Sequence, residues 1–140
     1  MNIGARQWLE MAALVGGLAL VAVGCGPALS TVSGNVTVDG KPLEKGAISY
    51  VPADNQGSPV TVDVAGGKYE LQVVAGKKMV QISAPFLKEK KKRYEGPDAP
   101  YDEFFDESLP AKYNSETTLT FDVQPGKNTK DWAVESQKPK

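Results

Sequence analysis

Hydrophobic and polar side chains alternate one by one along most of the sequence after residue 31. A period of two is typical of β-strands that bury one face. We expect seven such strands, at residues 32–38, 48–52, 60–64, 69–73, 80–85, 119–123 and 132–134. In the first strand Val32, Gly34, Val36 and Val38 share the face that we expect to be buried. No segment after residue 31 shows the pattern of a long helix.

Turn-forming residues separate these predicted strands, at residues 39–42, 53–59, 65–68, 75–77 and 125–128. Glycine adopts positive φ without steric cost, and proline lacks the N–H that a strand ladder needs. The pair Gly66 and Gly67 is a strong signal for a tight hairpin. Short strands joined by such turns predict an all-β fold, an antiparallel β-sandwich of about seven strands.

Residues 88–108 interrupt the alternation. A basic run at residues 88–93 is followed directly by an acidic and aromatic stretch. Charge that is segregated in this way rarely packs into a core, so we expect a long exposed loop.

The N-terminal segment has a different pattern. Arg6 precedes a charge-free apolar run at residues 11–23, and small residues lead into Cys25, the single cysteine of the chain. This order fits a secretory signal peptide, and the run is shorter than the roughly 20 residues that span a bilayer. The arrangement resembles a bacterial lipobox, although Ala22 replaces the usual leucine and Glu10 dilutes the positive start.

The lipobox implies cleavage after residue 24 and lipid attachment at Cys25. The lipid is a diacylglyceryl group on the thioether, usually with a third acyl chain, such as palmitate, on the new N-terminus. Each buried methylene contributes about 0.8 kcal/mol, so stable anchoring needs two or more chains. We therefore divide the chain into a signal peptide (1–24), a lipidated tether (25–31), a β-domain (32–135) with a charged loop (88–108), and a tail (136–140). An uncleaved anchor, an ordinary cleaved signal and a buried helix are the competing interpretations.

Composition narrows the possible functions. The chain has no histidine, which removes the usual general base and the commonest metal ligand. A Ser-His-Asp triad and a His-ligated zinc site are thereby excluded, and no carboxylate or Ser-Lys spacing suggests another catalytic site. The net charge is −1, so no overall field favours nucleic acid. We expect no enzyme activity and no cofactor.

The motifs in residues 32–52, Gly66 to Leu71 and residues 74–77 resemble a carboxypeptidase regulatory-like domain. Residues 109–128 are similar to the end of small planctomycete-type lipoproteins built on that domain. The resemblance covers nearly all of residues 31–135. It implies a transthyretin-like (prealbumin-like) Greek-key sandwich without a zinc-peptidase site.

Three segments are candidate sites with more than one interpretation. Lys112, Tyr113 and Asn114 either pack and cap a turn or recognise a ligand. The basic run, from Lys88 to Arg93, is either a solvated loop or a surface for anionic partners such as lipid headgroups. The acidic side chains after it offer oxygen ligands for calcium but lack EF-hand spacing; they are Asp98, Asp102, Glu103, Asp106 and Glu107.

These features predict a lipid-anchored, extracytoplasmic protein of the cell envelope, on the periplasmic face or at the outer membrane. Gly26 stands where some bacteria place an inner-membrane retention aspartate. The expected role is a non-catalytic binding or structural module. The alternative is an accessory carbohydrate- or peptide-binding subunit of an envelope enzyme or transport complex. The expected partners are the membrane and an envelope protein or glycan. We expect Trp132 in the core, and Trp8 belongs to the signal peptide.

Overall fold

The computed structural model describes Gly24 and residues 26–137. Residues 1–23 of the predicted signal peptide and the lipid site at Cys25 therefore lie outside the described residues. Within the described part the protein is all-β, and none of its helices is long and apolar enough to cross a membrane. One short 3-10 turn, η1 (Ala111–Tyr113), is its sole helical element.

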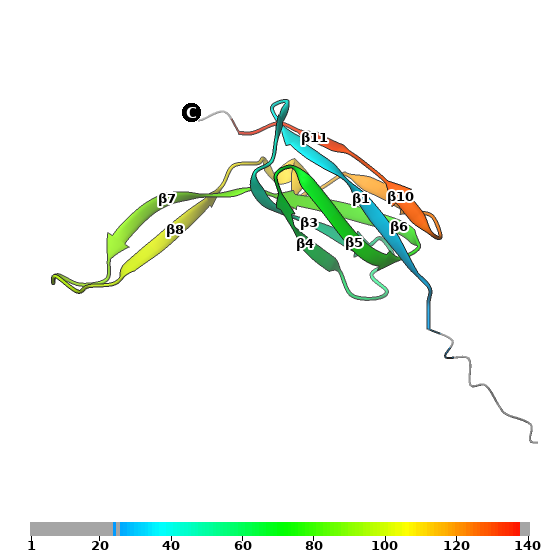
Figure 1. The fold of residues 1–140 in the computed structure, drawn as a ribbon, viewed down its shortest axis with the longest axis horizontal. Coiled ribbons are helices and arrows are strands. Elements are labelled where there is room, and N and C mark those ends of the chain that lie inside the picture. The colour runs from blue at the N-terminus through cyan, green and yellow to red at the C-terminus, as the bar shows by residue number, and fades with distance from the viewer. Residues whose placement is uncertain (1–23, 25, 138–140) are drawn as a thin grey trace, which may run out of the picture.

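Nine strands form one sheet that curls into a half-barrel (Figure 1). Along the sheet the order is β10-β1-β5-β4-β3-β6-β9, and β2 and β11 also pair with β1. Neighbours are antiparallel, apart from β10 and β11, which run parallel to β1. The bounds are β1 (Leu29–Val38), β2 (Lys41–Pro42), β3 (Lys45–Pro52), β4 (Val60–Ala65), β5 (Lys68–Val74), β6 (Gly76–Ser83), β9 (Thr120–Val123), β10 (Lys127–Thr129) and β11 (Trp132–Val134).

A tight turn connects β4 to β5. Gly66 and Gly67 form their connection with φ of 58° and 77°, which suits a two-residue hairpin turn. The two strands share a single residue pair, Ala65 with Lys68. They therefore diverge directly after the turn, and the inner faces of β3 and β5 come to enclose one core.

All seven predicted strands are confirmed, and the alternation predicts their inner faces. Val32 and Val36 of β1 are fully buried. Trp132 is buried in β11 as predicted. The core consists of Val32, Val36, Leu43, Ile48, Tyr50, Val64, Tyr69, Leu71, Val73, Val80, Ile82, Ala84, Leu109, Val123, Trp132 and Val134.

Gly34 lies on the predicted inner face because the backbone of Lys130 approaches β1 closely at this position. A Cβ at this position would lie 1.9 Å from the carbonyl oxygen of Lys130. The backbone between β10 and β11 passes close beside β1 here, and the Lys130 N–H donates to the Ser33 carbonyl at 2.9 Å. Only glycine allows this close approach.

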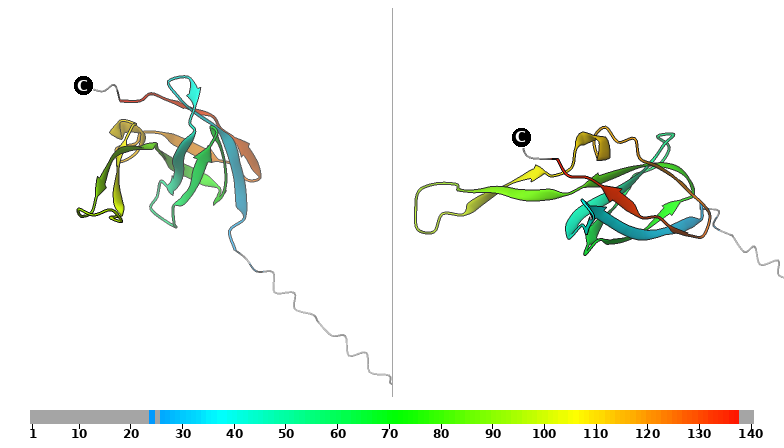
Figure 2. Two further views of the ribbon diagram at one scale, coloured as in Figure 1. Left: turned by 60° about the vertical axis from the view of Figure 1, so that its left-hand side comes forward. Right: turned by 90° about the horizontal axis from the view of Figure 1, so that it is seen from above.

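The prediction of a loop at residues 88–108 is wrong. Strands β7 (Pro85–Lys92) and β8 (Tyr101–Glu107) form a separate two-stranded antiparallel sheet. The segment is exposed as expected, and the hairpin extends away from the half-barrel (Figures 1 and 2). The basic residues of β7 face the acidic residues of β8 across the hairpin, so charge that is segregated along the chain becomes complementary in space.

Candidate functional site

The β7–β8 hairpin carries most of the exposed apolar surface. Of the eight large hydrophobic side chains that are exposed among the described residues, six belong to the hairpin. They are Phe86, Leu87, Tyr94, Tyr101, Phe104 and Phe105. Contiguous exposed apolar side chains mark interaction sites more often than isolated ones do. The hairpin is therefore the first candidate surface for contact with a partner.

Cross-strand ion pairs hold the charged side chains of the hairpin in register. The Lys90 ammonium lies 2.5 Å from the Glu103 carboxylate, to which Lys90 is directly opposite. The Arg93 guanidinium donates to Asp102 and lowers the pKa of that carboxyl group. These side chains are exposed to solvent, where such pairs contribute little to stability. Their main effect is to fix the positions of the charged side chains on the β7–β8 hairpin, which we also call the arm.

A third ion pair lies closer to the root of the hairpin, where the hairpin joins the half-barrel and Lys88 donates to Asp106 at 2.9 Å. This hydrogen bond lowers the pKa of Asp106 and raises the pKa of Lys88. Lysine ammonium groups also lie over aromatic rings, that of Lys91 at 5.8 Å from the Phe104 centroid. The surface of the arm thus combines aromatic rings with lysine and arginine side chains that are already paired with carboxylates.

The predicted calcium ligands are not brought together. Asp102, Glu103 and Asp106 are each paired with a different cation. Across Gly24 and residues 26–137, no group of three or more acidic, histidine or cysteine side chains is placed to hold a metal ion. Glu107 instead turns toward the body of the protein.

Glu107 fixes the root of the hairpin. One carboxylate oxygen accepts from the Ser83 hydroxyl at 2.5 Å, and the other accepts from the Ala84 and Leu109 N–H groups at 2.8 and 3.0 Å. Leu109 directly follows and is fully buried. The arm therefore leaves the half-barrel from an anchored base, which limits the directions in which it points.

A groove of about 500 Å³ lies beside this root. Its walls come from the ends of β3 and β4, with Ala47 and Val64, and from Pro85 and Phe105 of the hairpin. The groove is mainly apolar and extends the exposed surface of the arm onto the half-barrel.

The segment with Lys112, Tyr113 and Asn114 forms η1 and the turn after it. The Asn114 side chain accepts from the Ser115 N–H at 2.7 Å, which caps the turn as predicted. Tyr113 packs partly against the core. Its hydroxyl has no hydrogen-bond partner among the described residues, and the Lys112 ammonium lies 4.8 Å from its ring centroid. None of these three residues lines the groove at the hairpin root or the cavity described next.

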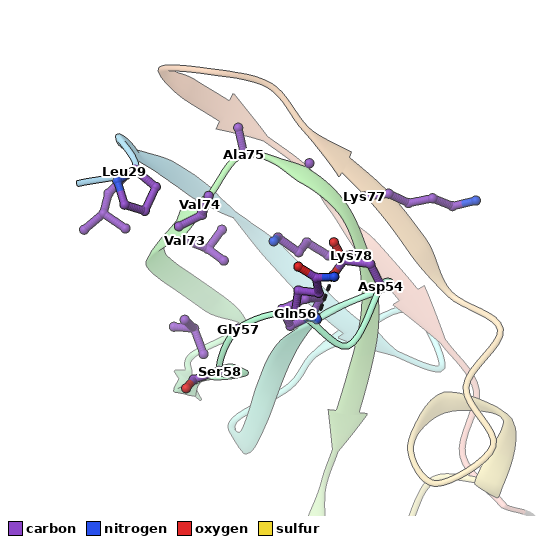
Figure 3. Close-up of a pocket in the computed structure, with 14 residues that line it drawn as sticks. Leu29, Asp54, Gln56, Gly57, Ser58, Val73, Val74, Ala75, Lys77 and Lys78 are labelled. Carbon is purple, nitrogen blue, oxygen red and sulfur yellow. Dashed lines mark hydrogen bonds between the residues drawn. The ribbon is translucent and has the colours of Figure 1, made fainter. Parts of the chain in front are cut away.

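A cavity of about 330 Å³ lies at the opposite end of the half-barrel (Figure 3). Apolar side chains from β1, β4 and β5 line it, including Leu29, Val60 and Val73. The turn between β3 and β4 supplies Asp54, Gln56 and Ser58. Lys78 of β6 also lines the cavity and is only 5% exposed.

Sequence reasoning missed Lys78. Its place in the alternation is the available signal, because residues 78, 80 and 82 share one face of β6 and Val80 and Ile82 are fully buried. A lysine at an inward position of a strand is unusual, since lysine is almost never buried without a partner.

No protein-family model matches this sequence, and no curated protein or solved structure matches it either.

Proposed function

We propose that this protein is a lipid-anchored, extracytoplasmic binding module of the cell envelope, which contacts a partner protein through the β7–β8 hairpin. Lipid on Cys25 holds it at the membrane. The domain is a transthyretin-like Greek-key sandwich of the carboxypeptidase regulatory-like type, as in small planctomycete-type lipoproteins. It has no catalytic role, which the lack of histidine in the sequence supports.

The observation that carries this proposal is the placement of the two ends of the molecule. Strand β1 begins at Leu29, four residues after Cys25. Leu29 lines the same cavity as the first residues of β6, so the chain enters β1 near the start of β6. The hairpin starts directly after the other end of β6. Eight residues of strand separate these ends by about 25 Å. An anchor at one end and an exposed aromatic arm at the other suit a module that reaches from a membrane to a partner (Figure 1).

The unpaired edges of the hairpin favour a second candidate, a peptide-binding accessory subunit. Strands β7 and β8 pair only with each other in the described structure, so each has one free edge. An extended peptide adds to such an edge through backbone hydrogen bonds. Both candidates use the same arm and differ in whether the bound segment is extended chain.

Photo-crosslinking in intact cells tests the arm. A photoreactive residue at Phe104 is expected to capture one distinct protein, whereas the same residue at Glu70, exposed on β5, is expected to capture none. Equal capture from both positions, or from neither, contradicts the proposed role of the hairpin. A captured segment that maps to an extended peptide selects the second candidate.

Fractionation of cells that express Cys25→Ser tests the anchor separately. We expect the protein to leave the membrane fraction or to accumulate as the uncleaved precursor, since the thioether requires the thiolate. A Cys25→Ser protein that stays membrane-bound and is correctly shortened contradicts lipid anchoring.

A further inference from the structure

Lys78 places a charged side chain inside the open end of the half-barrel. In the sheet it lies between Pro52 of β3 and Phe121 of β9. Figure 3 shows its side chain reaching toward Val73 and Val74, across the space bordered by the Asp54–Ser58 turn. The neighbouring Lys77 also borders the cavity, but its side chain points away from this space (Figure 3).

The ammonium group of Lys78 is not compensated by the described part of the chain. Lys78 and Ser30 are the two buried polar residues among the described residues, and Lys78 is the charged one. No hydrogen bond or salt bridge joins its side chain to any described residue, whereas four other basic side chains, all on the exposed hairpin, form ion pairs. No fully buried side-chain nitrogen or oxygen among the described residues lacks a hydrogen-bond partner, so the stem of Lys78 is buried while its Nζ reaches the solvent of the open cavity. The Lys78 ammonium therefore presents an unused cation to the cavity.

The walls of the cavity indicate what kind of anion fits. Most of the lining is aliphatic, from Leu29, Val60, Val73 and Val74, and the volume of about 330 Å³ is within the range of small-molecule sites. An apolar body would lie against these side chains while one charged group reaches Lys78. We propose that this cavity binds a small aliphatic monocarboxylate, with Lys78 as the residue that holds the carboxylate.

Asp54 is the reason for preferring a single negative charge. Its carboxylate lines the same cavity, where one oxygen accepts from the Gln56 N–H at 2.9 Å. A dianion such as a phosphate monoester would meet one cation and one like charge, which is unfavourable at short range. A monocarboxylate balances Lys78 alone, and the Ser58 hydroxyl and Gln56 amide add donors at the rim.

Titration with hexanoate tests the site directly. The full chain is held in nanodiscs of zwitterionic lipid, and hexanoate labelled with ¹³C at its carboxylate is followed by NMR. Hexanoate is short enough to remain largely in the aqueous phase. We expect saturable one-to-one binding of hexanoate. Hexanol should bind at least about tenfold more weakly than hexanoate, since a hydrogen bond between two charged groups is lost. Absence of saturable hexanoate binding, equal binding of hexanol, or tighter binding of hexyl phosphate or inorganic phosphate overturns the proposal.

Two lysine variants separate the cavity from general charge. Lys78→Met keeps an unbranched side chain and is expected to weaken hexanoate about tenfold or more. Lys77→Met removes the adjacent, outward-pointing charge and is expected to leave binding unchanged. Equal hexanoate affinity in Lys78→Met and the unmodified chain overturns the proposal.

The stability of Lys78→Met without ligand gives an independent readout. Removing an ammonium group that has no protein partner is expected to leave the melting temperature unchanged or raise it. A clearly lower melting temperature shows that Lys78 has a structural partner and overturns its assignment to a ligand. The site would bind the same carboxylate whether or not Cys25 carries lipid, so failure of this test is distinct from failure of the anchor.

Discussion

Replacement of Tyr69 by phenylalanine tests the hydrogen-bonded chain that fastens the C-terminal strands to the core. The Tyr69 hydroxyl donates to the Lys130 carbonyl at 2.6 Å. Its single hydrogen is thereby used, so the Tyr50 hydroxyl must be the donor in the 2.9 Å bond between the two tyrosines. The Trp132 indole N–H donates in turn to Tyr50 at 3.3 Å. Three donors therefore point one way along the chain and end on a backbone carbonyl.

Loss of the Tyr69 hydroxyl removes two of these bonds at once. It also leaves the Tyr50 hydroxyl without an acceptor, and Tyr50 is fully buried. A lost hydrogen bond costs about 1 kcal/mol, and an orphaned buried polar group costs about 1–3 kcal/mol. We expect Tyr69→Phe to lower the free energy of unfolding by about 2–4 kcal/mol. Tyr50→Phe also removes two bonds and leaves the Trp132 N–H without an acceptor. Its cost should still be smaller, because the bond from Trp132 is 3.3 Å long whereas the bond from Tyr69 to Lys130, which it keeps, is 2.6 Å long.

Urea unfolding of the chain that begins at Gly26 measures this difference. All core residues lie after residue 31, and Trp132 is then the single tryptophan, so its fluorescence reports the core. Tyr113→Phe is the matched control, since that hydroxyl has no partner among the described residues; its effect should stay within about 0.5 kcal/mol. The double variant Tyr50→Phe/Tyr69→Phe should lose less stability than the two single variants lose together, because it no longer contains the Tyr50 hydroxyl that Tyr69→Phe leaves without an acceptor.

Three outcomes refute this reasoning. Tyr69→Phe could cost no more than Tyr113→Phe, Tyr50→Phe could cost more than Tyr69→Phe, or the two tyrosine variants could be additive.

Three further predictions concern other contacts of the fold. Gly34→Ala forces a Cβ against the Lys130 carbonyl and should destabilise the chain by about 3 kcal/mol or more in urea unfolding; Gly26→Ala, with open space around it, should have no effect, and equal effects would contradict the close approach. Glu107→Ala removes three hydrogen bonds at the hairpin root and should speed amide exchange at Ala84 and Leu109; Glu103→Ala, in the exposed arm, should not, and unchanged exchange in Glu107→Ala would show that Leu109 alone holds the root. Burial raises the pKa of Tyr50 and Tyr69 above the ordinary value of about 10, so above pH 10 the folded state binds more protons than the unfolded state. Stability should then fall as pH rises, by about 1.4 kcal/mol per pH unit for each tyrosine, and more gently in Tyr69→Phe; equal slopes would contradict the burial argument.

Local sequence signals predict the strands of the half-barrel and the turns between them. Alternation identifies the inner face of β1 because the period of a strand is a property of consecutive residues. Gly66 and Gly67 predict the β4–β5 turn because the positive φ that a two-residue hairpin turn needs depends only on the residues of the turn itself. Neither inference depends on knowing what the strand packs against.

The hairpin could not be predicted in the same way. Lys90 and Glu103 are thirteen residues apart, and their pairing depends on the register between two strands. A run of lysines by itself indicates a solvated segment. The signal that was available is that a basic run and an acidic run of similar length follow one another, separated by Gly96 and Pro97. Opposite charges placed symmetrically about such a turn favour a hairpin.

The Tyr50–Tyr69–Trp132 chain was beyond sequence reasoning for a related reason. Its members come from β3, β5 and β11, and each alone is an ordinary aromatic residue on an inner face. Only the curl of the sheet brings the two hydroxyls and the indole N–H together. Burial of a tyrosine does predict that its hydroxyl has a partner, but it does not identify which one.

Glu107 and Lys78 show why one charged group near β6 is structural and the other indicates a ligand. Glu107 lies beside the end of β6 at Ser83, where its carboxylate accepts three hydrogen bonds from protein groups. Lys78 lies near the start of the same strand, is nearly completely buried, and has no partner among the described residues. Polar burial is stabilising only when the hydrogen-bonding capacity is used. Glu107 meets that condition within the fold, so its removal should loosen the hairpin root. The Lys78 ammonium has no protein partner and reaches the solvent of the open cavity, so its removal should change binding and leave the fold intact.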